Sequence, residues 1–149
     1  MEVSIVTNFI IDRFRANTMV NTISVKPQSE IDFEKSNIYP LVNIDLTALQ
    51  PLESVHQMTF NITVFQQRDI KPTINLDNKL LNTNLIDNLN ETYSIASKFI
   101  NYMRSFNNDE DIEVISISEV TPLKNVLTNG LDGVTFNIVL EIPDLTGCE

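Results

Sequence analysis

The side chains that could do chemistry in this chain are one histidine and a surplus of carboxylates. A Ser–His–Asp arrangement would need His56 as its base, but no Gly-x-Ser-x-Gly turn presents a serine nucleophile. Zinc is usually held by sets of His and Cys side chains, and Cys148 is the only cysteine. We therefore interpret His56 as a residue at the end of a strand, and we expect neither a catalytic site nor a metal site.

The carboxylates form two local groupings. Asp87 and Glu91 lie one turn apart on the polar side of a predicted helix. A catalytic carboxyl pair needs one member in an apolar pocket, whereas this helix face is predicted to be solvated. The run Asp109 to Asp111 lacks the spaced ligands and the glycine of a calcium-binding loop. No cofactor is expected. A small carboxylate-dependent enzyme stays open as an alternative, which a pocket joining two carboxylates to His56 would favour.

Charge and length limit the function further. The 149 residues carry 20 Asp and Glu against 10 Lys and Arg, a net charge of −10. Because Lys and Arg supply most of the affinity for nucleic acid, tight DNA binding is not expected. Acidic side chains lining a passage would instead repel DNA and let it slide. No apolar run approaches the roughly 20 residues of a membrane span. The length and the 42% apolar content predict a single domain, residues 1–149.

Hydrophobic periodicity predicts two helices. The first is amphipathic and runs from about Ser4 to Asn17. The second is longer and runs from about Asn84 to Phe106, with Asn82, Thr83 or Asn84 as its N-cap. Its expected apolar stripe is Leu85, Leu89, Tyr93, Ala96, Ile100 and Met103, widened by Ile86 and Phe99.

Alternation of apolar and polar residues predicts the strands. In order along the chain they are residues 22–25, 38–46, 56–66, 112–117 and 134–142. Asn129-Gly130 and Asp132-Gly133 are predicted to form turns before the last strand. Residues 69–83 break the pattern and are predicted to be a long connecting loop. The fold class that follows is α+β: a small twisted, mainly antiparallel sheet with an N-terminal helix and one long helix packed on one face.

The order of these elements resembles that of the tail-terminator and tail-completion proteins of tailed bacteriophages. The resemblance covers nearly the whole chain and rests on topology and pattern. It is carried by the N-terminal amphipathic helix, the strand opening Tyr39-Pro40-Leu41-Val42, the strand Met58 to Phe65 ending near Arg68-Asp69, the long helix Leu85 to Phe106, and the closing Asn129-Gly130/Val134–Ile142 hairpin. It implies a structural virion protein, assembled in the host cytoplasm, that forms a ring of six or twelve copies at the head–tail junction.

The implied partners are other copies of this chain, the portal or connector and the tail proteins, with DNA only passing through the lumen. A ring subunit needs surfaces that close by rotation and segments that reach its neighbours. The polar face of the Met58–Phe65 strand and the loop 69–83 are the expected contact surfaces. The candidate inter-subunit contact residues are Arg68, Asp69, Lys71, Asn75, Asp77 and Lys79. The alternative from another class is a monomeric adaptor or inhibitor that binds one partner through a sheet edge.

Overall fold

A computed structural model describes residues 2–27, 30, 38–68, 73–75, 80–82, 84–105, 112–126 and 130–143. Several residues that the sequence singles out lie outside the described residues: Asp69, Lys71, Asp77, Lys79, Thr83, the run 109–111 and Cys148.

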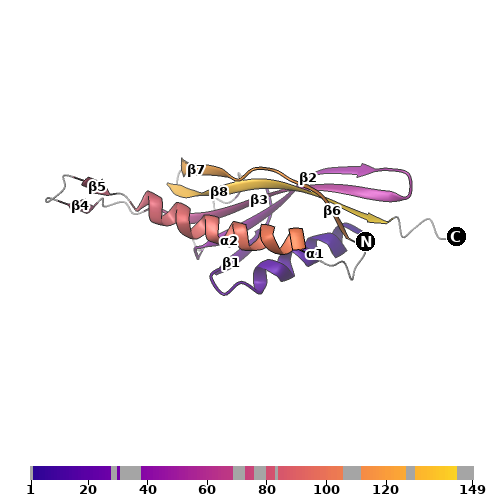
Figure 1. The fold of residues 1–149 in the computed structure, drawn as a ribbon, viewed down its shortest axis with the longest axis horizontal. Helices are drawn as coiled ribbons and strands as arrows, with labels where there is room; N and C mark the ends of the chain where they lie inside the picture. The colour runs from indigo at the N-terminus through magenta and orange to yellow at the C-terminus, as the bar shows by residue number, and fades with distance from the viewer. Residues whose placement is uncertain are drawn as a thin grey trace.

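The protein has an α+β fold built on an open, mixed six-stranded sheet (Figure 1). The strand order is β1 (Thr22–Val25), β2 (Leu41–Pro51), β3 (Val55–Gln67), β8 (Leu131–Pro143) and β6 (Glu113–Ile117), and β7 (Thr121–Val126) also pairs with β8. β1 runs parallel to β2, and every other pair in this sheet is antiparallel. The predicted fold class is confirmed.

Two helices, α1 (Glu2–Arg15) and α2 (Leu85–Ser105), lie on the same face of the sheet (Figure 1). On this face β3 presents the predicted alternating residues from Met58 to Val64, which are buried against apolar residues of β8. Phe14 of α1 stacks on Phe99 of α2 with ring centroids 4.3 Å apart, and Phe99 also contacts Phe136 of β8. The main core therefore lies between the sheet and the helix layer.

The other face of the sheet carries no helix among the described residues (Figure 1). Successive strand residues point to opposite faces, so Phe65 points away from the side chain of Val64 and from the main core. It forms a small second cluster with Leu41 and Leu131. Side chains on both faces of the sheet are therefore buried at the end near Phe65.

Several local predictions were wrong. Asp132 and Gly133 do not form a turn; both lie in β8, opposite Gln66 and Phe65. A Cβ at Gly133 would lie 1.9 Å from the carbonyl oxygen of Val64, so this glycine is required by close backbone approach. The strand β7 and the extension of β2 to Pro51 were missed.

Candidate functional site

Residues 69–83 connect β3 to α2, and we call this segment the arm. It was predicted to be a loop, but its described residues form two short strands, β4 (Thr73–Asn75) and β5 (Leu80–Asn82), which pair with each other. They form a two-stranded sheet of their own rather than extending the six-stranded one. Figure 1 shows these two strands beyond the N-terminal end of α2.

The N-terminal end of the arm follows Arg68, which forms an ion pair with Asp132 of the same chain. Arg68 Nε donates to Asp132 Oδ2 at 3.0 Å, and Arg68 Nη2 lies 2.8 Å from Asp132 Oδ1. The side chain of Asp132 is fully buried, while that of Arg68 is 24% exposed. The backbone N–H of Arg68 also donates to the carbonyl oxygen of Gly130 at 3.1 Å. Both the backbone and the side chain of Arg68 are therefore fixed to the start of β8.

The C-terminal end of the arm leads into α2, and Asn88 of this helix is hydrogen-bonded to the same carboxylate. Asn88, in the first turn of α2, donates from Nδ2 to Asp132 Oδ2 at 3.2 Å and to the carbonyl oxygen of Gln67 at 3.1 Å. Its backbone N–H donates to the carbonyl oxygen of Asn84 at 3.0 Å. A buried carboxylate is tolerated only when its oxygens are paired, and here that pairing joins the two ends of the arm. We call Arg68, Asn88 and Asp132 the arm base.

The arm base changes the interpretation of one predicted contact residue. Arg68 was predicted to contact a neighbouring subunit; its guanidinium pairs with Asp132 within the same chain, and its contact with a neighbour stays a prediction. Asn75 lies in β4 opposite Leu80. The other candidate contact residues lie outside the described residues, so their role stays a prediction. The sequence analysis did not identify Asn88 and Asp132 as site residues. Asn88 lies in the part of the helix whose polar face was predicted to be solvated, and Asp132 lies in a predicted turn.

The helix-free face carries a ladder of polar side chains. Asn61 Nδ2 donates to Thr135 Oγ1 and to Asn137 Oδ1, both at 3.0 Å. The hydroxyls of Thr63 and Thr135 lie 3.1 Å apart. This is the polar face of the Met58–Phe65 strand that was predicted as a contact surface. Because cross-strand pairs satisfy these groups, the face is rigid and polar.

A groove runs along α2 and consists of two adjoining pockets that share Tyr93 and Val120. The first pocket, of about 370 Å³, is apolar and lined by Ile86, Leu89, Asn90, Tyr93, Val120, Pro122 and Val134. The second, of about 270 Å³, is more polar and is lined by residues that include Ser97, Arg104, Ser118 and Glu119. We call the two together the α2 groove.

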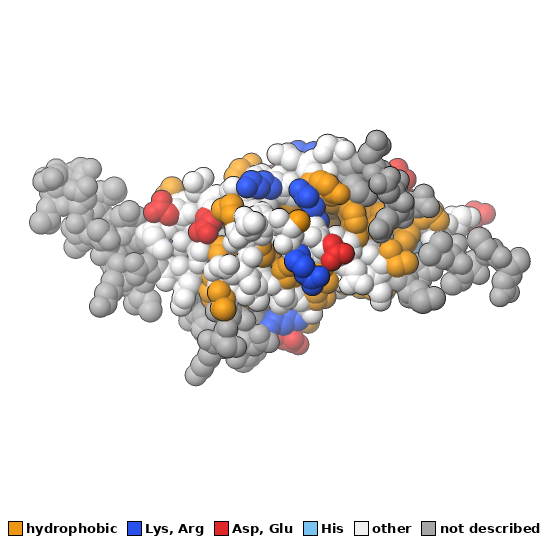
Figure 2. Space-filling model, turned by 90° about the horizontal axis from the view of Figure 1, so that it is seen from below, with side chains coloured by type: hydrophobic (Ala, Val, Ile, Leu, Met, Phe, Trp, Pro, Cys, Tyr) orange, Lys and Arg blue, Asp and Glu red, His pale blue; other side chains and the backbone are white. Residues whose placement is uncertain are grey.

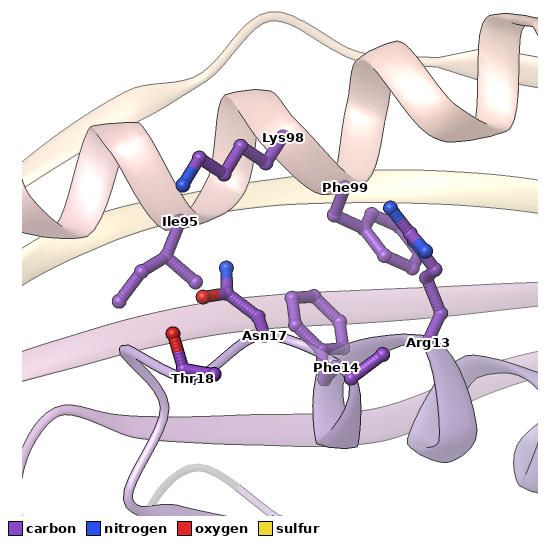
Figure 3. A pocket seen from close by; sticks show the side chains of 8 residues that line it. Arg13, Phe14, Asn17, Thr18, Ile95, Lys98 and Phe99 are labelled. Carbon is purple, nitrogen blue, oxygen red and sulfur yellow. The ribbon is translucent and has the colours of Figure 1, made fainter.

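A separate cavity of about 180 Å³ lies between the end of α1 and the middle of α2 (Figure 3). Figure 3 shows Arg13 and Lys98 at opposite sides of it, with Asn17 and the stacked rings of Phe14 and Phe99 between them. Arg13 also lies over the ring of Tyr102, 3.8 Å from its centroid. Figure 2, which looks onto the helix layer, shows Lys and Arg side chains over its middle. Among the described residues that line this cavity there is no carboxylate.

The residues considered for catalysis are His56, Asp87 and Glu91. His56 lies in β3 between Pro51 and Ile142 and lines none of five pockets in the described part of the chain. Asp87 is exposed, and Glu91 accepts a hydrogen bond from Gln66 at 3.1 Å. None of those five pockets joins two carboxylates to His56.

Among the described residues, no group of three or more His, Cys, Asp or Glu side chains is placed to hold a metal ion. No helix in the described part of the chain combines the length and the apolar character needed to cross a membrane. A comparison with protein-family models finds no match, and a comparison with curated protein sequences finds none either.

Proposed function

We propose that this protein is a structural virion protein that assembles with copies of itself into a ring at the head–tail junction of a tailed bacteriophage. The arm base supports this proposal most directly. A segment that leaves the core sheet, with both legs fixed to the buried Asp132, is suited to grip a neighbour at a defined angle. A fixed attachment also lowers the entropy lost when the segment is ordered by contact.

The proposal also specifies which proteins the ring contacts and how DNA passes through it. Six or twelve copies would join the portal or connector to the tail proteins and let DNA pass through the lumen. The helix-free face carries acidic side chains, among them Asp45, Glu113 and Glu141. Lining the lumen with this face would repel the phosphates of passing DNA and prevent it from sticking.

One observation favours the adaptor alternative. β6 is a terminal strand of the six-stranded sheet, and the side chain of Ile115 in it is 43% exposed. An exposed edge strand can accept an extended segment of another protein as an extra strand. In that case the protein would act as a monomer on one partner.

The experiment that separates the two is the mass of the full-length protein in solution, measured by multi-angle light scattering over a concentration series. A discrete species near six or twelve times 16.9 kDa supports the ring. Deleting Lys71 to Lys79 should then leave a folded monomer. Oligomers unchanged by that deletion would contradict the role of the arm. A monomer at all concentrations that also fails to bind portal and tail-tube proteins would contradict the ring itself.

A further inference from the structure

The α2 groove contains apolar side chains that the core does not use. Ile86 is 72% exposed and Tyr93 is 54% exposed, although the helical periodicity predicted both on the buried side of α2. The buried side of α2 instead begins with Asn88 and Thr92, because the N-terminal half of the helix lies over the arm base and not over the apolar core. A large exposed tyrosine beside an exposed isoleucine is the kind of apolar surface that marks a contact site.

The groove is held open by a fixed wall. Opposite α2, the wall consists of the segment that joins β6 to β7 and the start of β7. Ser118 donates its backbone N–H to the carbonyl oxygen of Asn137 at 2.9 Å, and its hydroxyl accepts the N–H of Asn137 at 2.8 Å. Because β8 holds this wall in place, a partner would not need to open the groove before binding.

The polar end of the groove carries one charge of each sign. Arg104, in the last turn of α2, and Glu119, on the opposite wall, line the same pocket. Among the described residues neither forms an ion pair. Both are exposed. A partner that presents an acidic and a basic side chain a short distance apart would satisfy both.

The arm contains both apolar residues and charged residues of each sign, as the groove does. Its sequence from Thr73 to Asn82 is TINLDNKLLN, which places Asp77 and Lys79 between the two strands among isoleucine and leucine residues. A two-stranded hairpin is marginally stable by itself and needs a surface to pack on. Each leg of the arm has about seven residues and can reach roughly 23 Å. The helix from Ile86 to Arg104 is of comparable length, roughly 27 Å.

We propose that the α2 groove of one copy receives the arm of a second copy. The isoleucine and leucine residues of the arm would cover Ile86 and Tyr93, and the charged residues between its two strands would pair across the polar end, Asp77 with Arg104 and Lys79 with Glu119. The proposal rests on the assembly proposed above and names its interface. Arm and groove are different surfaces, so the contact is heterologous, and repeating it with closure produces a ring.

A charge exchange tests the contact. Lys79→Glu and Glu119→Lys should each place like charges together and raise the concentration at half-assembly at least tenfold, as measured by light scattering at low salt. The double variant should assemble within about threefold of the wild type. Lys124→Glu, an exposed change outside the groove, is the control and should leave assembly unchanged. A double variant that assembles no better than the singles would overturn the proposal.

A mixing experiment tests the direction of the contact. The variant with Lys71 to Lys79 deleted keeps the groove, and Tyr93→Glu, a change at an exposed side chain, keeps the arm. Each should be monomeric alone, and an equimolar mixture should form a dimer and nothing larger. A mixture that stays monomeric, or that forms full rings, would contradict an arm-in-groove contact.

A third measurement separates this contact from the ring. A cyclised peptide with the sequence of residues 71–82 is titrated into the full-length protein and followed by NMR. Shifts at Ile86, Tyr93 and Glu119 that Tyr93→Glu abolishes would support the contact even if the protein alone is monomeric. In that case only the ring proposal would fail. Rings without any such shifts would overturn the groove and leave the ring standing.

Discussion

Arg68 and Asp132 are 64 residues apart in the chain and meet through two contacts, of 3.0 and 2.8 Å, at the point where the arm leaves the sheet. The planar guanidinium matches the two oxygens of the carboxylate, which is the strongest form of this pair. Because the carboxylate is fully buried, the pair fixes the geometry of the chain at that point more than it adds to stability.

Removing one partner of this pair should lower the stability of the fold. Arg68→Ala removes the opposite charge that pairs with the buried carboxylate of Asp132, and we expect a loss of about 3–5 kcal/mol in the free energy of unfolding. Urea unfolding followed by circular dichroism measures it. The matched control is Arg15→Ala, which breaks the exposed Arg15–Asp12 pair and should cost less than about 1 kcal/mol. If the two variants lost the same free energy of unfolding, the arm base would not be a buried element that stabilises the fold.

Gly133 should not tolerate a side chain. Gly133→Ala places a Cβ against the carbonyl oxygen of Val64, and we expect the β3–β8 pairing to be distorted at a cost of about 1–3 kcal/mol or more. Gly130, with φ of 63°, is the control, because asparagine tolerates this backbone conformation and Gly130→Asn should be nearly neutral. The measurement is thermal unfolding of both variants. A neutral Gly133→Ala would mean that the strands are further apart than the structure shows.

The stacked pair Phe14–Phe99 should couple α1 to the rest of the core. Either phenylalanine replaced by alanine should destabilise the fold by about 3–5 kcal/mol. The milder changes Phe14→Leu and Phe99→Leu suit a double-mutant cycle, for which we expect a coupling of about 0.5–1.5 kcal/mol. Additive effects of the two leucine variants would show that the stack contributes nothing beyond the area it buries.

The acidic side chains of the helix-free face should keep DNA from sticking. We expect the variant Asp45→Lys with Glu141→Lys to bind double-stranded DNA in a salt-dependent way, measured by a filter-binding titration of the assembled protein. Asp12→Lys with Asp87→Lys gives the same net charge on the helix side and is the control. Equal DNA binding by both variants would argue against this face as the lining of the lumen.

The sequence by itself determined the elements whose signal is local. Strict alternation from Met58 to Val64 and from Val134 to Ile142 specified strands with one buried face, because burial on one face requires a period of two. The helical periodicity of Phe99, Ile100 and Met103 specified the buried side of the last turns of α2, and all three are buried as predicted. These residues need only their neighbours in sequence to define which way they point.

Only the tertiary structure decided where those patterns end and what covers them. Asp132-Gly133 has the composition of a turn, but pairing with β3 and the ion pair between Asp132 and Arg68 hold it in a strand. Ile86 and Tyr93 continue the apolar pattern of α2, but the polar arm base occupies the space beneath that end of the helix and leaves both exposed. The physical reason is the same in both cases: a buried carboxylate must be paired, and its partners come from segments that are distant in sequence.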